Sequence, residues 1–216
     1  GGCRGGGGVG WGVLTGGAPR GGGRVGFRAG GPWPYGGAWT ADASRKVARF
    51  TQLAQLFHLP IVHLADIPGF LVGLEAEKTA TIRHGVAALT AIQQTTVPWC
   101  AVIVRKAYGV AAAGHSNQSR YSVRYCWPSM RAGSLPLEGG IEAAFRKDIE
   151  AAPDPQAKIA ELRERLQRLG SPFRTLEAFA YDEMIDPRET RSLLCEFANL
   201  VAPLREAGPS NFGYFP

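Results

Sequence analysis

The segment from residue 61 to residue 115 constrains the fold most, because it holds two short apolar runs separated by a helical pattern. The first run, Ile61-Val62-His63-Leu64-Ala65, stops at Asp66-Ile67-Pro68-Gly69-Phe70. A helical pattern follows over about residues 79–94, and a second apolar run covers residues 100–104. Two short apolar strands joined by a helix are typical of a parallel β-α-β unit buried on both faces. We therefore predict an α/β fold with a parallel sheet.

The turn after each predicted strand is a candidate ligand site, since ligands in such sheets lie where strands end and helices begin. The second turn reads Tyr108-Gly109-Val110-Ala111-Ala112-Ala113-Gly114, with only small or aliphatic residues after the tyrosine. Small side chains let a ligand approach the backbone, and the first N–H groups of a helix have no intrahelical partner. Such amides can stabilise an oxyanion by about 3–4 kcal/mol each. Tight packing of a helix on the sheet would require the same composition, so both interpretations stay open.

Composition and charge narrow the functional classes. The 216-residue chain has a net charge of +6, but its Lys and Arg residues are scattered and form no run of five, so we expect no nucleic-acid partner. Cys3, Cys100, Cys126 and Cys195 form no Cys-x-x-Cys pair, so we expect no metal site, and free thiols fit a reducing compartment. No apolar run approaches the roughly 18 residues that span a membrane, and no signal peptide is visible. We expect no membrane partner and a cytoplasmic protein.

The flanking segments supply further elements. Residues 13–15 and 24–27 predict two short strands in a hairpin. Asp42 is a candidate N-cap for a helix that ends before Pro60. Asp154 and Pro155 predict the start of an amphipathic helix, with Asp as N-cap and Pro at the first helical position. Residues 188–200 predict a last helix.

Several motifs, each weak alone, resemble one family by their number and order. They are Asp66-Ile67-Pro68-Gly69-Phe70, Ile82-Arg83-His84-Gly85, Val104-Arg105-Lys106-Ala107-Tyr108-Gly109 and Ile185-Asp186-Pro187-Arg188-Glu189-Thr190-Arg191. The family is the carboxyltransferase (β) subunit of biotin-dependent acyl-CoA carboxylases, the propionyl-CoA carboxylase β group. The resemblance covers about residues 13–200 and is to the second, C-terminal domain of that subunit.

This resemblance implies a crotonase-like (ClpP/crotonase) fold, in which a twisted parallel sheet is layered with helices. It places an acyl-CoA carboxyltransferase C-terminal domain over residues 13–206. We expect the glycine-rich residues 1–12 to be disordered and residues 207–216 to form a loose tail.

The resemblance also implies an activity. Such a domain is the biotin-side half of a carboxyltransferase, which transfers carboxylate from carboxybiotin to the α-carbon of a short acyl-CoA of the propionyl-CoA or acetyl-CoA type. The implied partners are acyl-CoA, a biotin carboxyl carrier or biotin carboxylase subunit, the carboxyltransferase N-terminal domain and further copies of the chain. A biotin-dependent acyl-CoA decarboxylase subunit and a non-catalytic truncated assembly module remain alternatives. A crotonase-like hydratase or isomerase would need a positioned Glu or Asp, and residues 109–114 contain none.

The implied site residues lie in the two turns. The oxyanion hole is assigned to the backbone amides of Val110 and Ala111, and biotin binding to Gly109, Ala112 and Tyr108. The substrate pocket is assigned to Asp66, Pro68, Gly69, Phe70 and Ala113. The sequence departs from the family at Val110, where glycine is common, and at Gly30-Gly31-Pro32, where the family usually has an asparagine shortly before the proline. It also carries no counterpart of the first domain.

Overall fold

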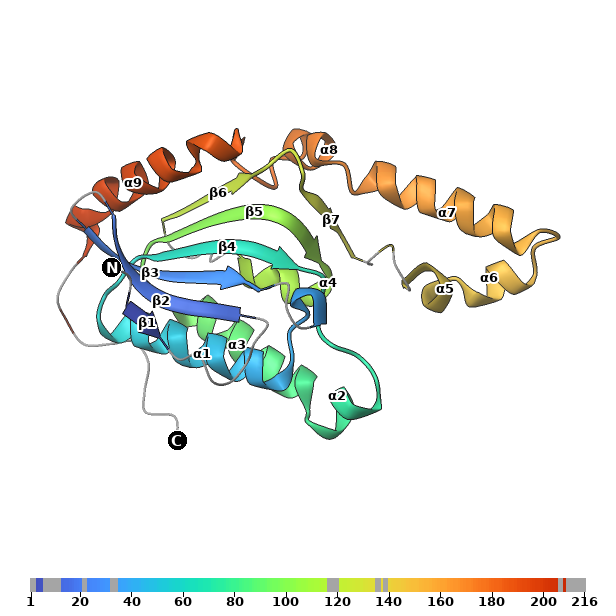
Figure 1. Cartoon of the computed structure of the whole chain (residues 1–216), viewed down its shortest axis with the longest axis horizontal. Coiled ribbons are helices and arrows are strands. Elements are labelled where there is room, and N and C mark those ends of the chain that lie inside the picture. Colours follow the sequence, from blue (N-terminus) through green and yellow to red (C-terminus); the bar gives the residue numbers. More distant parts are fainter. Residues whose placement is uncertain are drawn as a thin grey trace.

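The fold is built on one mixed sheet, which a computed structural model shows with helices on both faces (Figure 1). The structure describes residues 3–5, 13–20, 23–31, 35–115, 121–134, 137, 140–205 and 208. The strands of this part of the chain are β1 (Cys3–Gly5), β2 (Val13–Arg20), β3 (Gly23–Gly30), β4 (Ile61–Ile67), β5 (Trp99–Tyr108), β6 (Ser122–Cys126), β7 (Arg131–Gly133) and β8 (Glu183–Met184). Their order is β1-β2-β3-β4-β5-β6-β8, and β7 pairs with β5.

The type of strand pairing changes once across the sheet, from antiparallel to parallel at β3. The strands β1, β2 and β3 are antiparallel, and every pairing from β3 to β8 is parallel. The predicted hairpin is therefore confirmed, although its strands are longer than predicted. The helices are α1 (Ala41–Leu56), α2 (Leu74–Lys78), α3 (Thr81–Gln94), α4 (Gly109–Ala112), α5 (Gly140–Ala144), α6 (Arg146–Glu150), α7 (Pro155–Leu169), α8 (Pro172–Glu177) and α9 (Thr190–Leu200).

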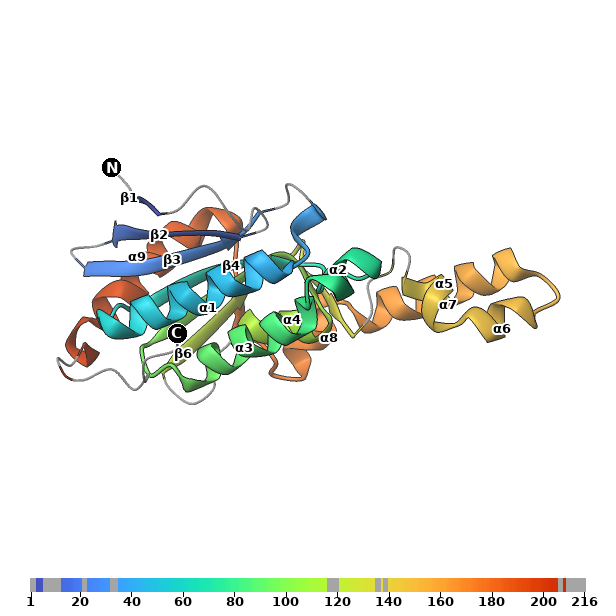
Figure 2. The ribbon, with the colours of Figure 1, turned by 90° about the horizontal axis from the view of Figure 1, so that it is seen from below.

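Both faces of the parallel part are buried, as the apolar runs predict. α1 and α3 cover one face, and α9 covers the other (Figures 1 and 2). Ile61 and Ile103 lie in the core cluster on the α1–α3 side. Val62 and Val102 lie in the cluster that includes Leu194 and Phe197 of α9. Successive strand residues thus pack against opposite layers, and the predicted α/β fold with a parallel β-α-β unit is confirmed.

Two helix boundaries differ from the prediction. Thr40, and not Asp42, is the N-cap of α1, because the Thr40 side chain accepts a hydrogen bond from the Ala43 amide. Asp42 instead lies in the first turn and pairs with Arg45. The predicted helix over residues 79–94 begins at Thr81, and Ala80 before it has a φ of +55°. The predicted start of α7 is confirmed, since Asp154 accepts hydrogen bonds from two first-turn amides.

The terminal segments lie mostly outside the described residues. Cys3–Gly5 is an exception to the expected disorder of residues 1–12, because it forms β1 and pairs with β2. In the C-terminal tail, the Gly208 carbonyl oxygen lies 2.7 Å from His58 Nε2. Among the described helices, none combines the length and the apolar composition needed to cross a membrane.

An arm extends from one end of the sheet and consists of α5, α6 and α7 (Figure 1). It has a small core of its own, in which Ile141, Ile149 and Leu162 are buried together. The apolar stripe predicted for α7 is therefore used within the chain at Leu162, while Leu169 at its end is exposed.

Candidate functional site

The two turns singled out in the sequence lie side by side at the carboxyl edge of the sheet. β4 and β5 are parallel neighbours, and Ile67 near the first turn pairs with Ala107 near the second. A Cβ atom built on Gly69 would lie 4.0 Å from the carbonyl oxygen of Tyr108. The structure thus brings together the two groups of residues that the sequence assigned to one site.

A helix begins directly after β5, at the small-residue turn. Gly109 is the first residue of α4 and has a φ of +63°, a conformation that side-chain-bearing residues avoid. The first-turn N–H groups of a helix lack intrahelical partners, and those of this turn include the amides of Val110 and Ala111. Val110 is 66% exposed, while Ala111 is buried in the core. The turn can therefore present backbone donors to a ligand without a large side chain between them.

The remaining predicted biotin-binding and pocket residues divide into packed and open positions. Tyr108 and Ala112 are buried, and Gly109 is half-buried. In the pocket set, Pro68 is half-buried and Ala113 is exposed. The open positions, rather than Tyr108 and Ala112, can contact a ligand through their surfaces.

Asp66 is committed to an ion pair within the chain. Its carboxylate accepts hydrogen bonds from Arg105 Nη2 at 2.8 Å, from Arg105 Nε at 3.2 Å and from the Lys106 amide at 3.0 Å. The β4–β5 register shifts between Ala65 and Ile67, so this carboxylate joins the strands at an irregularity. Asp66 therefore fastens the two turns together. Sequence reasoning missed Arg105 as its partner, although an Asp and an Arg-Lys pair at neighbouring strand ends are a usable signal.

The first turn is also tied to Trp39. The Trp39 amide donates to the Gly69 carbonyl oxygen at 2.9 Å, and the Leu71 amide donates to the Trp39 carbonyl oxygen at 2.9 Å. The rings of Trp39 and Phe70 pack edge to face, with centroids 5.9 Å apart. Gly30 packs closely on the same turn, since a Cβ there would lie 2.7 Å from the Asp66 carbonyl oxygen. This contact is a physical reason for glycine at a position where the sequence departs from the family.

A buried arginine lies beneath the second turn and was missed in the sequence. Arg28 on β3 is 0% exposed. Its Nη2 donates to Nδ1 of the adjacent His63 at 2.7 Å and to the Gly114 carbonyl oxygen. Its guanidinium carbon lies 5.4 Å from the Trp39 ring centroid and 5.2 Å from that of Trp99. A second arginine in β3, after Arg24 near its start, was the available signal.

Charge in this buried group is carried by the arginine alone. Burial lowers the pKa of Arg28 to about 9, so the side chain remains protonated at pH 7. Burial lowers the pKa of His115 to about 4, and burial together with the Arg28 charge lowers the pKa of His63 well below 6.5. Both histidines are therefore neutral at pH 7.

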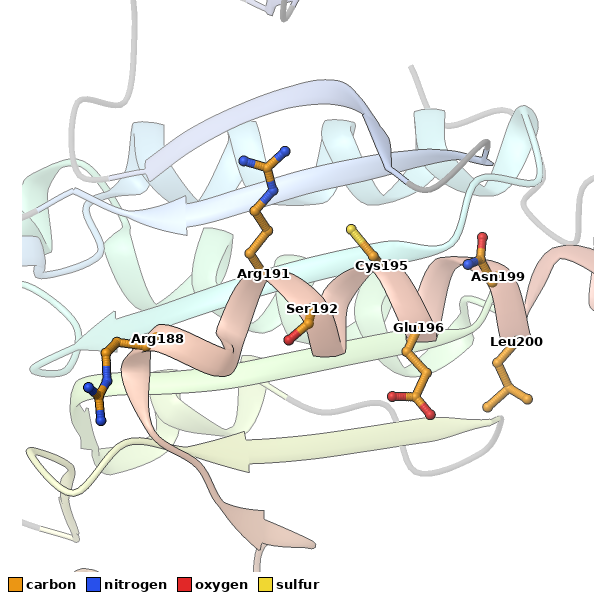
Figure 3. A pocket seen from close by; sticks show the side chains of 7 residues that line it. All are labelled: Arg188, Arg191, Ser192, Cys195, Glu196, Asn199 and Leu200. Atoms are coloured by element: carbon orange, nitrogen blue, oxygen red, sulfur yellow. The ribbon is translucent and has the colours of Figure 1, made fainter.

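The surface groove that the structure contains along α9 lies outside the predicted site, and the described residues offer no metal site. A surface groove lies along α9 and the 3-10 turn before it, Pro187–Glu189, and none of its seven labelled side chains belongs to the predicted set (Figure 3). Within the part of the chain that the structure describes, no group of three or more His, Cys, Asp or Glu residues could hold a metal ion.

Comparison with known proteins gives consistent matches. Residues 7–210 match the model of the carboxyl transferase domain. The methylmalonyl-CoA carboxyltransferase 12S subunit of Propionibacterium freudenreichii subsp. shermanii is 35% identical over 195 residues, which cover 89% of this chain and 37% of that protein. The propionyl-CoA carboxylase carboxyltransferase subunit of Haloferax mediterranei is 34% identical, with 86% of this chain and 36% of that protein covered.

A solved structure supports the same family assignment. The transcarboxylase 12S structure, described as a hexamer assembly with methylmalonyl-coenzyme A and methylmalonic acid bound, superposes with a TM-score of 0.80. It is 35% identical, and the match covers 95% of this chain and 40% of that one. The chain thus spans well under half the length of the relatives it matches.

Proposed function

Because the chain belongs to the carboxyl transferase domain family, whose crotonase-like fold it shares, we propose that it forms the biotin-side half of an acyl-CoA carboxyltransferase. The reaction would transfer carboxylate between carboxybiotin and the α-carbon of a short acyl-CoA. The observation that supports this proposal is the start of α4 at Gly109, directly after β5 at the carboxyl edge of the sheet, since the first amides of a helix lack intrahelical partners.

The residues of the two turns suit a group that gains negative charge on an oxygen. The amides of Val110 and Ala111 would donate hydrogen bonds to that oxygen, and the open surface of Gly109 would let it approach. Carboxybiotin, brought by a carrier, would supply the carboxyl group and a ureido oxygen of this kind. Pro68, Gly69, Phe70 and Ala113 would line the approach to the turn, with Asp66 and the packed Tyr108 and Ala112 holding its backbone in place.

The proposed partners are a second carboxyltransferase half and a protein that carries biotin. The chain spans 37% of the length of the 12S subunit, so a carboxyltransferase N-terminal half would supply the acyl-CoA side. A biotin carboxyl carrier or biotin carboxylase subunit would bring the biotin. A cytoplasmic location fits the free thiols of Cys100, Cys126 and Cys195.

Reconstitution tests this function. The chain would be mixed with an N-terminal carboxyltransferase half and a carboxylated biotin carrier, and transfer of labelled carboxylate to propionyl-CoA would be measured. We expect transfer only when all three proteins are present. Binding of the carrier without turnover would favour a non-catalytic assembly module, and release of label as CO₂ from a dicarboxylic acyl-CoA would favour a decarboxylase. Absence of carrier binding would contradict the proposal.

We further expect the chain to form homo-oligomers. Several large apolar side chains are exposed, among them Val72, Leu74, Ile82, Val86 and Val110. Where exposed apolar side chains form a contiguous patch, they mark an interaction surface. Light scattering should give a mass of at least twice 23.1 kDa at micromolar concentration. A monomer at every concentration up to about 1 mM would contradict this expectation.

A further inference from the structure

The far end of the candidate oxyanion turn is held by two side chains of the sheet and by one of its own. The turn consists of α4 and one 3-10 turn, Ala113–His115. A helix this short is not stable by itself, and its last carbonyl groups lack intrahelical partners. Three side chains supply donors to these carbonyl groups. Arg28 Nη2 donates to Gly114, Trp99 Nε1 donates to His115 at 2.9 Å, and His115 Nδ1 donates to Ala112.

Arg28 is suited to hold this end of the helix. A cation near a helix C-terminus interacts favourably with the helix dipole. The rings of Trp39 and Trp99 lie at cation–π distance from the guanidinium. One hydrogen of Nη2 is directed to His63 Nδ1, so the other is oriented toward Gly114. The Nη2 contacts therefore tie a carbonyl group of the turn to the sheet, while Arg28 Nε and Nη1 have no hydrogen-bond partner among the described residues.

The backbone of the turn has little room to move toward the sheet. A Cβ atom on Gly114 would lie 2.8 Å from Cη2 of Trp39, so the Trp39 ring packs directly against the backbone there. Trp39 also holds the first turn through its hydrogen bonds to Gly69 and Leu71. The buried group of Arg28, Trp39 and Trp99 thus contacts both turns of the site.

We propose that Arg28 and Trp99 are positioning residues for the oxyanion turn. They fix the carbonyl groups of Gly114 and His115, and through the rigid turn they hold the amides of Val110 and Ala111 in register with the sheet edge. This inference rests on the proposed function of that turn. Neither side chain touches the reacting atoms, since Arg28 is fully buried and the Trp99 indole lies in the core.

Amide hydrogen exchange on the full chain tests the placement without any activity. Arg28→Met places an apolar side chain of similar length at this position. We expect exchange over residues 112–115, whose amides lie beyond the unpartnered start of α4, to become at least 10-fold faster, with exchange in β4 changed less than twofold. Arg28→Lys, which restores the cation, should recover part of the protection. Arg163→Met is the matched control, because Arg163 is exposed on α7 and remote from the turn.

Kinetics in the reconstituted mixture supply the second readout. A small displacement of catalytic donors lowers turnover by up to about 100-fold, so Arg28→Met should lower kcat by about 10- to 100-fold while KM for acyl-CoA stays within twofold. If Arg28→Met does not fold, Trp99→Phe is the second variant. It keeps a six-membered aromatic ring, removes the donor to His115 and leaves a smaller side chain in the core, and it should lower kcat by about 3- to 10-fold.

The outcomes separate the two proposals. Unchanged exchange over residues 112–115 in the folded variants would overturn the positioning role, as would a uniform increase that includes β4. A wild-type chain that transfers no carboxylate would overturn the proposed function. In that case the exchange result would still decide whether Arg28 and Trp99 hold the turn.

Discussion

Replacing Val110 with proline is expected to lower kcat for carboxyl transfer by about 100- to 1,000-fold, the effect of removing one oxyanion-hole donor. Proline has no backbone N–H, so the substitution deletes the proposed donor itself. Val110 lies in the first turn of α4, where proline is tolerated because no intrahelical bond is lost. The residue before it is Gly109, which accepts the backbone restriction that precedes proline more easily than other residues. The reconstituted transfer assay measures the loss.

Val110→Ala is the matched control for this substitution. It keeps the amide and shortens a side chain that is 66% exposed, so activity should remain within about threefold of the wild type. The melting temperatures of both variants should stay close to that of the wild type. A Val110→Pro chain that folds and retains more than a tenth of wild-type kcat would show that this amide is not a donor to the reacting oxygen.

Local patterns in the sequence predict the centre of this fold and the place of the site. The apolar runs from Ile61 and from Cys100 identify β4 and β5, because parallel strands buried on both faces need continuous apolar sequence. The small residues after Tyr108 identify the start of α4. These features depend on residues that are close in sequence, so the local residue pattern predicts them.

Element boundaries depend on contacts that the local pattern does not contain. The apolar run predicts that the second strand ends at Val104, yet β5 continues through Arg105 and Lys106 to Tyr108. Asp66 pairs with Arg105, and β7 supplies backbone partners from Arg131 onward, so polar residues can remain in the strand. Asp66 and β7 are both distant from the end of β5 in sequence, so the local pattern does not show these contacts.

The residues that pack behind the two turns, Arg28 and Trp39, could not be predicted from the sequence. Both residues precede the two turns by many positions, and neither belongs to one of the motifs that indicate the family. Their role depends on β3 lying beside β4, which places Arg28 opposite His63. Only this long-range register brings a buried cation to the end of a helix that begins 81 positions later in the chain, at Gly109.

Removing the Asp66 carboxylate is expected to lower the free energy of unfolding by about 2–4 kcal/mol in Asp66→Ala. Hydrogen bonds to a charged group contribute about 1.5–3 kcal/mol each, and here the Lys106 amide and Arg105 both lose their acceptor. The Arg105 side chain is 50% exposed and can turn to water, so the loss should stay below the upper end of the about 3–5 kcal/mol typical of a fully buried pair. Urea denaturation followed by circular dichroism measures this change.

Two further variants distinguish this ion pair from an ordinary surface pair. Asp66→Asn keeps an oxygen that can accept from the Lys106 amide, so its cost should be about half that of Asp66→Ala. Glu75→Ala removes the exposed Glu75–Lys78 pair and should cost less than about 1 kcal/mol. Because Asp66 joins the ends of β4 and β5, Asp66→Ala should also reduce kcat in the reconstituted assay, and Glu75→Ala should not. Equal, small costs for Asp66→Ala and Glu75→Ala would mean that the two turns are held together without this carboxylate.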